Sequence, residues 1–425
     1  MSNTFDGVLR EFPYIGVDRF NTSASVFLLT HCHADHLSGI TNKSFTSIVY
    51  CSEETKLLLS LDSRLKGLLN LITGVPFNVK TRLETPHDTA NAIYITLIEA
   101  YHCLGACMFL VEERVSRAVL CTGDIRAESW WRESARLSPA LFPYTSGDKI
   151  LNCIYFDSTF AYRGEPYIEI PTNFNGIHTA ISMLREYPKN DPEIKFEFCD
   201  TTLGFEQAWA YVLSYFGGSL VVKASSLKQK LLLVAQYDRI NGNILRRAML
   251  PPTAFNTGPV FYGGSSPKGD FSIVRIKQCI NFNIKDYTGI CCPISIESIP
   301  SATDLNLLKV TKAGNKIYEF LGRHWVLPLK QNELLPLKIK LLFSRHSSYS
   351  EVREFLSMFK PQEVFPCVYS QEVWSSGFIM ARIFGDICSR QEFNYDSMMA
   401  TMYGLPSQEI RDRPVVTINR WNIED

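Results

Sequence analysis

The chain has 425 residues, more than one ordinary domain of about 100–200 residues, so we expect two domains or one large composite domain. Its hydrophobic content of 46% excludes an intrinsically disordered chain. Lysine plus arginine and aspartate plus glutamate both number 43, giving a formal net charge of zero. A chain-wide basic field is therefore excluded, and any nucleic-acid binding must come from a local patch.

Two further features bear on the compartment. No apolar run approaches the roughly 20 residues that a membrane helix needs, so no membrane partner is expected. The twelve cysteines are scattered through apolar stretches, and the N-terminus has no secretory signal pattern. This usage predicts reduced, buried thiols and a cytosolic or nuclear protein.

The first 160 residues alternate apolar runs with polar turns, which is the pattern of an α/β domain. One longer segment, 52–72, is expected to be helical, with Ser52 as a candidate N-cap. Apolar runs of strand length, bounded by polar residues or glycine, predict buried strands. These runs are residues 25–32, 47–51, 92–100, 107–113, 118–124 and 150–158.

From about residue 160 the pattern predicts a second α/β unit. Its expected helices are 177–188 and 205–217, and its expected strands are 195–200 and 219–222. Proline and glycine cluster between roughly residues 250 and 270, which predicts a surface loop. The last part of the chain is expected to form a strand at 339–350, an amphipathic helix at 351–359 and a further helix at 374–390.

The segment THCHADH, directly after the apolar run at 26–29, carries the strongest chemical signal. His31, His33, Asp35 and His36 place three imidazoles and a carboxylate within six residues. On a strand-to-helix turn these groups converge, as a site for two cations requires. A single histidine beside a strand is usually a surface residue, but burying all four groups without a metal would leave several polar groups unsatisfied. The segment therefore predicts a metal site.

An H-x-H-x-D-H motif at a strand end is the signature of the metallo-β-lactamase fold, and the chain resembles that family. The resemblance implies a further histidine ligand and a bridging aspartate downstream, and His102 and Asp124 are the candidates. Asp157 in IYFDSTF and His346 in SRHSSYS resemble the motif A acid and the motif B histidine of the β-CASP branch. Singly, His102 or Asp124 would be ordinary, but the order and spacing of the whole set match the family.

The stretch HSSYSE, followed by KPQEVFPCV, is similar to the Artemis-like DNA-repair branch of the β-CASP nucleases. Motif C of this family tends to be valine in members that act on DNA and histidine in members that process RNA. The matching position is Val368, and no histidine follows His346, which favours DNA. The chain also departs from the family pattern: Tyr101 and Leu104 flank the motif histidine where glycine and proline are usual, and Arg345 stands where relatives more often carry an aromatic or acidic residue.

The resemblance implies an α/β fold class, namely a metallo-β-lactamase αββα sandwich with an inserted α/β β-CASP cap domain. The first part of the metallo-β-lactamase domain is expected at residues 1–158 and the cap at 159–335. The second part, with a C-terminal extension, is expected at 336–425. A monomer is expected.

The resemblance also assigns the metal ligands. One cation is assigned to His31, His33, His102 and Asp124. The second is assigned to Asp35, His36, the shared Asp124 and, as an assisting ligand, His346. Histidine nitrogens with few carboxylates suit zinc, as one or two ions, with Mg²⁺ or Mn²⁺ as alternatives at the second position.

The residues implied to act in catalysis are Asp35, Asp157, His346 and Asp18. Asp18 is expected to orient a ligand histidine, the alternative being a turn residue at a strand end. Asp157 is expected to orient ligands or to assist proton transfer. His346 is either a ligand or the general acid that protonates the leaving oxygen, and the sequence leaves both roles open.

Two groups of hydroxyl residues are candidates for binding phosphate or DNA. Ser347 and Ser348 lie where a helix is expected to begin, so they would present hydroxyls and backbone N–H groups to an anion. Thr201 and Thr202 lie in a strand-to-helix turn of the cap, where the alternative is a simple helix cap.

The leading hypothesis is a metal-dependent DNA nuclease, acting as a 5′ exonuclease or on hairpins and overhangs, in double-strand-break or interstrand-crosslink repair. The resemblance alone implies a nuclear location and partners among repair proteins. The alternatives are an RNA-processing endonuclease, a small-molecule hydrolase and a scaffold of the same fold that has lost turnover.

Overall fold

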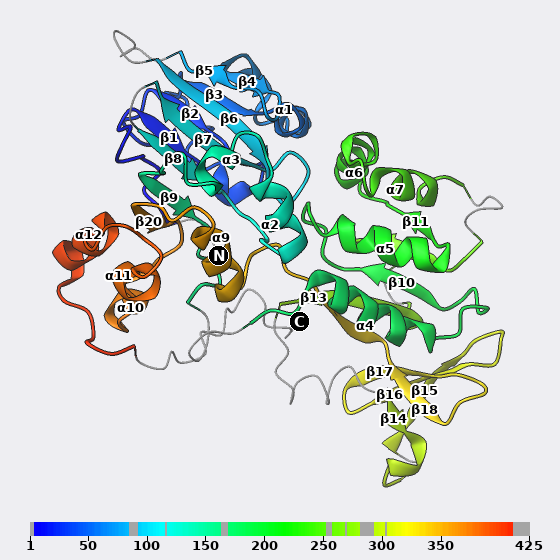
Figure 1. Ribbon diagram of the computed structural model, residues 1–425. Coiled ribbons are helices and arrows are strands. Elements are labelled where there is room, and N and C mark those ends of the chain that lie inside the picture. Colours follow the sequence, from blue (N-terminus) through cyan, green and yellow to red (C-terminus); the bar gives the residue numbers. More distant parts are fainter. Residues whose placement is uncertain are drawn as a thin grey trace. The chain divides into compact units, whose positions relative to one another are not determined.

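The computed structural model describes residues 4–84, 92–114, 117–162, 169–251, 257–267, 270–280, 293–301 and 304–410. The chain divides into two compact units (Figure 1): unit 1 comprises residues 1–169 and 345–425, and unit 2 comprises residues 170–344. Residues 411–425, in the expected C-terminal extension, lie outside the described residues. No helix within the described residues is long and apolar enough to cross a membrane.

Unit 1 contains two sheets among its described residues. The first sheet has the order β1-β2-β3-β4 and is parallel throughout. Its strands are β1 (Ile15–Val17), β2 (Val26–Leu28), β3 (Ile48–Ser52) and β4 (Ile72–Val75). The second sheet has the order β20-β9-β8-β7-β6-β5, with parallel pairing from β20 to β8 and antiparallel pairing from β8 to β5. Its strands are β5 (Thr81–Arg82), β6 (Ile93–Glu99), β7 (Cys107–Glu113), β8 (Ala118–Cys121), β9 (Cys153–Phe156) and β20 (Glu363–Pro366).

The predicted N-cap at Ser52 is confirmed, because its hydroxyl accepts a hydrogen bond from the backbone N–H of Thr55 at 3.0 Å. The prediction of one helix over 52–72 is wrong. Helix α1 (Glu53–Ser60) ends at Ser60, a 3₁₀ turn η2 (Lys66–Leu71) follows, and Ile72 already begins β4. Ile72 is buried in the hydrophobic core that covers the first sheet, so tertiary packing overrides the helical pattern.

The other helices of unit 1 are short. They are η1 (Ala34–His36), α2 (Ser129–Arg136), α3 (Phe142–Thr145), α9 (Tyr349–Ser357), α10 (Gln371–Ser375), α11 (Met380–Phe384) and α12 (Asn394–Tyr403). The predicted helix over 374–390 is therefore wrong, since α10 and α11 are separate. Gly377 between them has φ +87°, a left-handed conformation that ends a helix.

Thr30, which follows β2, joins the two sheets of unit 1. Its carbonyl oxygen accepts a hydrogen bond from the backbone N–H of Cys107, the first residue of β7, at 3.0 Å. On its other side lies Gly123, whose φ is +55° and where an added Cβ would come within 2.6 Å of the Thr30 side chain. A residue with a side chain would not fit there, so Gly123 lets the loop after β8 approach the end of β2.

Unit 2 is also an α/β structure. Its parallel sheet has the order β11-β12-β10-β13-β19. The strands are β10 (Lys195–Phe198), β11 (Ser219–Val221), β12 (Val260–Gly263), β13 (Ile273–Cys279) and β19 (Lys338–Leu342), and the helices are α4 (Asn173–Arg185), α5 (Glu206–Phe216), α6 (Ser225–Tyr237) and α7 (Gly242–Ala248). A second, antiparallel sheet has the order β14-β18-β17-β16-β15. Its elements are β14 (Ile294–Ser295), followed by a 3₁₀ turn η3 (Ile296–Ser298), then β15 (Asn306–Val310), β16 (Lys316–Phe320), β17 (Arg323–Leu327) and β18 (Glu333–Pro336).

One expectation for this part of the chain needs correction, and the bounds of the two compact units differ from the predicted domain bounds. The segment near 250–270 is not all loop, because it contains β12, which is paired on both sides within the parallel sheet. The unit boundaries lie after Glu169 and Ser344, instead of after residues 158 and 335. The later second boundary has a physical cause: β19 pairs with β13 and thus belongs to the sheet of unit 2. The predicted α/β class is confirmed for both units.

Candidate metal centre

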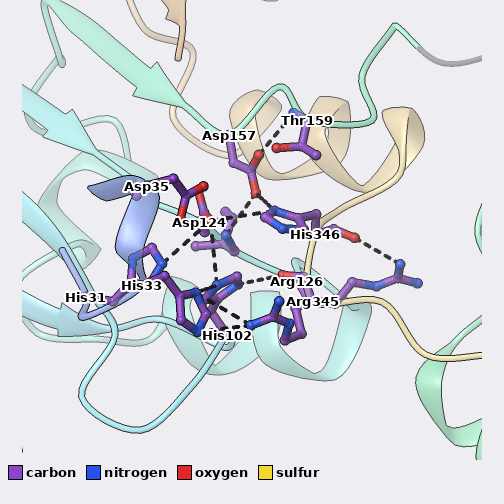
Figure 2. Close-up of polar contacts among 12 residues, drawn as sticks. His31, His33, Asp35, His102, Asp124, Arg126, Asp157, Thr159, Arg345 and His346 are labelled. Atoms are coloured by element: carbon purple, nitrogen blue, oxygen red, sulfur yellow. Dashed lines mark hydrogen bonds and ion pairs between the residues drawn. The ribbon is translucent and has the colours of Figure 1, made fainter. Parts of the chain in front are cut away.

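Polar side chains gather in unit 1 where its strands end (Figure 2). Asp18 directly follows β1, and His31 comes three residues after the end of β2. In the second sheet His102, Asp124 and Asp157 lie just after β6, β8 and β9. Because strand ends of neighbouring parallel strands meet at one edge of a sheet, residues far apart in the sequence converge here.

Four of the predicted ligands form one donor group: His31, His33, His102 and Asp124 each present a ligand atom, and these atoms lie within 4.8 Å of one another. Nε2 of His102 lies 3.1 Å from Nδ1 of His33 and 3.6 Å from Oδ2 of Asp124. Nε2 of His31 lies 3.6 Å from the same Oδ2.

The hydrogen bonds behind the group decide which nitrogens carry lone pairs. The Thr30 hydroxyl donates its hydrogen to Oδ2 of Asp18 at 2.6 Å, so towards Nδ1 of His31, 3.0 Å away, it acts as an acceptor. The His31 proton therefore sits on Nδ1, and Nε2 presents a lone pair. That Nε2 is buried and makes no hydrogen bond within the described residues. A buried lone pair facing a carboxylate and two imidazoles fits a cation ligand.

His102 is oriented in the same way. Its Nδ1 donates to the backbone carbonyl oxygen of Arg345 at 2.9 Å, so its Nε2 also presents a lone pair to the group.

Burial lowers the pKa of His31, and the neighbouring His36, His33 and His102 lower it further. Burial likewise lowers the pKa of His102, against the opposing effect of Asp124. Both rings are thus held in the neutral form that binds metals.

A second donor group consists of Asp124, Asp157 and His346. Nδ1 of His346 lies 2.8 Å from Oδ2 of Asp157 and 3.9 Å from Oδ2 of Asp124. Asp157 is held by backbone N–H groups, Ile125 donating to Oδ2 at 3.1 Å and Thr159 to Oδ1 at 3.0 Å. Burial would raise the pKa of Asp124, but the neighbouring His36, which also hydrogen-bonds to it, outweighs this effect together with His346 and His102, so the net shift of the Asp124 pKa is downward.

The composition of the second group differs from the predicted second ligand set. Asp157 takes part in it, whereas Asp35 and His36 belong to neither group. His36 is nevertheless close, with Nε2 3.3 Å from Oδ2 of Asp124. Asp35 lies in the turn η1 with a side chain that is 36% exposed, and its Oδ2 is 3.9 Å from Nε2 of His36. Both residues therefore border the two groups, with Asp35 on the solvent side.

Asp18 holds the HxHxDH turn in place. It is buried and has φ +55°, a left-handed conformation that is uncommon for residues other than glycine. Its carboxylate accepts from the Thr30 N–H at 2.7 Å and from the Thr30 hydroxyl, and its Oδ2 is 2.8 Å from Nδ1 of His36. Burial lowers the pKa of His36, but Asp124 and Asp18 more than compensate, so the net shift is upward.

We expect Asp18→Asn to weaken zinc binding by about 10–100-fold, the usual cost of losing a hydrogen-bond partner behind a ligand histidine. Asparagine has only one acceptor oxygen, so it cannot accept at both positions, from the Thr30 N–H at one and from the Thr30 hydroxyl and His36 Nδ1 at the other. The measurement is a competition titration of zinc against a chromophoric chelator. Asp148→Asn, in an exposed loop of unit 1, serves as the control, and equal zinc affinities for the two variants would contradict the role of Asp18.

The predicted phosphate-binding serines are engaged with protein groups. The Ser347 hydroxyl donates to the Ile125 carbonyl oxygen and accepts from the Ala127 N–H, both at 2.8 Å. Ser348 is the N-cap of α9, forms a capping box with Glu351 and contacts Glu169 at 2.8 Å. Both serines are almost fully buried. Their hydroxyls therefore stabilise the start of α9, and a phosphate would have to displace these partners.

Thr201 and Thr202 lie in unit 2 and are exposed. They precede α5, but its N-cap is Phe205 and no side chain caps the helix. The alternative interpretation of these threonines as a helix cap is therefore wrong, and their role in binding DNA remains a prediction.

Sequence reasoning missed three residues at the centre. Thr30 sets the His31 tautomer, and Arg126 donates to the His346 carbonyl oxygen at 3.1 Å. Arg345 places its guanidinium 3.0 Å from Nε2 of His33 (Figure 2). Of these three residues, only Arg345 could have been singled out from the sequence, because it departs from the family pattern. Another departure, Tyr101, packs its ring edge-on against Trp130 with centroids 4.9 Å apart.

Histidine and aspartate donors at the strand ends of an α/β unit fit the predicted metallo-β-lactamase fold, and comparison with known proteins agrees. Residues 337–372 match the family model described as DNA repair metallo-beta-lactamase. Protein artemis of Homo sapiens is 24% identical over 388 residues, covering 86% of this chain and 49% of that protein. Protein artemis of Gallus gallus is 25% identical over 382 residues, covering 86% and 47%. DNA cross-link repair protein SNM1 of Arabidopsis thaliana is 22% identical over 346 residues, covering 81% and 61%.

These matches confirm the predicted resemblance to the DNA-repair β-CASP branch of the metallo-β-lactamase fold, including its similarity to Artemis. The predicted fold class, a metallo-β-lactamase fold with a β-CASP unit, is confirmed as well. The chain spans about half the length of the Artemis relatives it matches. The family resemblance and the two donor groups together indicate a metal-binding site.

Proposed function

We propose that this protein is a metal-dependent DNA nuclease that hydrolyses phosphodiester bonds, with unit 1 as the metallo-β-lactamase domain and unit 2 as its β-CASP cap. The observation that carries the proposal is that two donor groups share Asp124. One aspartate common to an imidazole-rich group and a carboxylate-rich group is suited to hold two cations close together, as phosphodiester hydrolysis by two metals requires.

Zinc is the proposed metal of the imidazole-rich group, His31, His33, His102 and Asp124, because nitrogen-rich donor sets favour it. At the second position Asp124, His346 and Asp157, bordered by His36 and Asp35, could also hold Mg²⁺ or Mn²⁺. Bound cations would supply Lewis-acid stabilisation of the phosphoryl oxygens and activation of water.

Residues of the protein orient His346, which is the candidate for transferring a proton to the leaving oxygen. Asp157 accepts the Nδ1–H of His346 and is itself fixed by the backbone N–H groups of Ile125 and Thr159. Because Nδ1 is used in this hydrogen bond, Nε2 is the ring nitrogen left to act. It could do so either as a metal ligand or as the general acid that protonates the leaving oxygen.

DNA is the proposed substrate in preference to RNA because of Val368, at the motif C position. Its backbone N–H and C=O both bond the Ser158 hydroxyl, at 2.9 and 2.6 Å, and its side chain is buried. The side chain therefore contributes packing and no proton chemistry next to Asp157. The family model described as DNA repair metallo-beta-lactamase and the relative named DNA cross-link repair protein SNM1 support a role in double-strand-break or crosslink repair, a nuclear location and repair-protein partners; we propose that the protein acts as a monomer.

The proposal is tested with purified protein on end-labelled single-stranded DNA, a DNA hairpin and a single-stranded RNA of matched sequence, with divalent metal supplied or chelated. We expect DNA to be cleaved only with metal, and product lengths to show whether cutting proceeds from the 5′ end or internally. An Asp35→Ala variant provides the inactive control. Cleavage of RNA alone would establish the RNA-processing alternative. Metal binding without cleavage of either nucleic acid would favour the scaffold or small-molecule alternative.

A further inference from the structure

Two tryptophans are neighbours at the start of α2, and only one of them is buried. Trp131 is 7% exposed and packs against Phe355 with ring centroids 5.8 Å apart. Trp130 is 52% exposed. Trp131 therefore attaches α2 to the core of unit 1, and Trp130 contributes little to that packing. A single exposed apolar side chain is ordinary on a protein surface, so its orientation and its location decide what it can do.

The ring of Trp130 is held in a fixed orientation. Its Nε1–H donates to Oε2 of Glu128 at 3.0 Å. The ring of Tyr101 packs edge-on against it, with centroids 4.9 Å apart and an interplanar angle of 70°. Because the indole N–H already has an acceptor, the exposed part of the side chain offers apolar ring surface to a ligand. A ring that is already oriented loses little conformational entropy when a ligand binds to it.

The ring pair is carried by two loops that also carry proposed metal ligands. Tyr101 directly precedes His102, and consecutive Cα atoms are only about 3.8 Å apart. The carbonyl oxygen of Tyr101 accepts the backbone N–H of Arg126 at 2.8 Å. Arg126 follows Asp124 by two residues and precedes Trp130 by four. The two rings therefore lie on the loops after β6 and β8, next to the imidazole-rich donor group.

The pair is a feature of this chain and not of the family pattern. Tyr101 stands where glycine is usual in the family, and a glycine would provide no ring to pack against Trp130. A strand whose phosphate sits at the metal centre brings its flanking bases to the same surface, since successive nucleotides are spaced about 3.4 Å along a stacked strand. Every nucleobase has a π face, so an exposed and oriented aromatic ring suits stacking whatever the base sequence.

Resting on the proposed nuclease function, we propose that Trp130, oriented by Tyr101, stacks against an unpaired nucleobase that flanks the phosphodiester at the metal centre. Trp130 is thus a substrate contact that adds to the metal ligands. In a duplex the bases already stack on one another and must first be unstacked. The contact therefore favours single-stranded ends and loops over uninterrupted duplex.

The test is a cycle in which the ring and the base are removed separately and together. The inactive Asp35→Ala protein is loaded with zinc, alone and combined with Trp130→Ala, Trp130→Phe or Phe142→Ala. Each protein is titrated with a fluorescent oligothymidylate and with versions that carry one abasic residue at successive positions, followed by anisotropy at several KCl concentrations. Phe142 on α3 is 51% exposed, which makes Phe142→Ala the matched control. Zinc content is measured for every protein.

We expect Trp130→Ala to weaken binding of the intact strand by about 5–150-fold, the range for removing one aromatic ring that stacks on a base. Trp130→Phe should retain most of the affinity, and Phe142→Ala should lose none. With the abasic residue at the stacked position, the difference between Trp130 and Trp130→Ala should disappear. The slope of log K against log salt should be unchanged, because no phosphate contact is lost. Zinc content should be the same in all proteins.

Equal effects of Trp130→Ala on the intact strand and on every abasic strand would overturn the inference, because the ring would then not contact a base. Loss of zinc from Trp130→Ala would also overturn it, since the residue would act by holding the loops of His102 and Asp124. An equal loss of affinity in Phe142→Ala would indicate a general apolar surface instead. Failure of the wild-type protein to bind and cleave DNA would reject the proposed function, whereas cleavage without coupling between ring and base would reject only the role of Trp130.

Discussion

Replacing Asp124 with asparagine is expected to lower metal-dependent cleavage of DNA by about 10²–10³-fold, the scale of losing one charge-stabilising group in an active site. One oxygen of this side chain, Oδ2, lies between 3.3 and 3.9 Å from nitrogens of four histidines, namely His31, His36, His102 and His346. Asparagine keeps the size but removes the negative charge that both donor groups share. The two measurements are the initial cleavage rate and the number of zinc ions retained after gel filtration.

Asp148→Asn is the control for this prediction, because it removes an aspartate charge from an exposed loop of unit 1. It should retain the cleavage rate and zinc content of the wild type. If Asp124→Asn bound zinc and cleaved DNA as well as Asp148→Asn does, Asp124 could not be the shared ligand, and the two-cation proposal would fail.

Replacing Arg126 with methionine is expected to lower the free energy of unfolding of unit 1 by about 3–5 kcal/mol, the cost of removing one partner from a buried ion pair. Arg126 is fully buried between Glu128 and Glu351 and also donates to the His346 carbonyl oxygen. Burial raises the pKa of Glu351, an effect that Arg126 opposes. Without the guanidinium, the buried carboxylate of Glu128 and the largely buried carboxylate of Glu351 would both lose its positive charge. Urea unfolding followed by tryptophan fluorescence measures the change.

Two further variants make this prediction specific. Arg64→Met removes an exposed arginine and should change the unfolding free energy by less than about 1 kcal/mol, because surface ion pairs contribute little. Arg126→Met combined with Glu351→Gln should recover part of the loss, since one of the two isolated carboxylates is then neutral. A single variant Arg126→Met as stable as Arg64→Met would show that the buried pairs are not the source of stability.

The sequence by itself determined the local chemistry and most of the strands. HxHxDH after a buried apolar run is a local pattern, and its spacing places His31 and His33 in the short segment between β2 and the 3₁₀ turn η1. The apolar runs at 92–100 and 107–113 became β6 and β7, because strands buried on both faces leave long hydrophobic stretches. Ser52 capped its helix as expected, since an N-cap depends on the next three residues alone.

Tertiary structure decided the features that depend on distant partners. The helix expected over 52–72 ended early because Ile72 is buried with the first sheet. Asp157, and not Asp35, joined Asp124 and His346, because β8 and β9 are neighbours and end at the same edge. The contact between His102 and Arg345 joins residues 243 positions apart. Such pairs are set by strand order and loop packing, which sequence periodicity does not encode. The sequence therefore determined which metal-binding groups are present, and only the fold determined which of them meet.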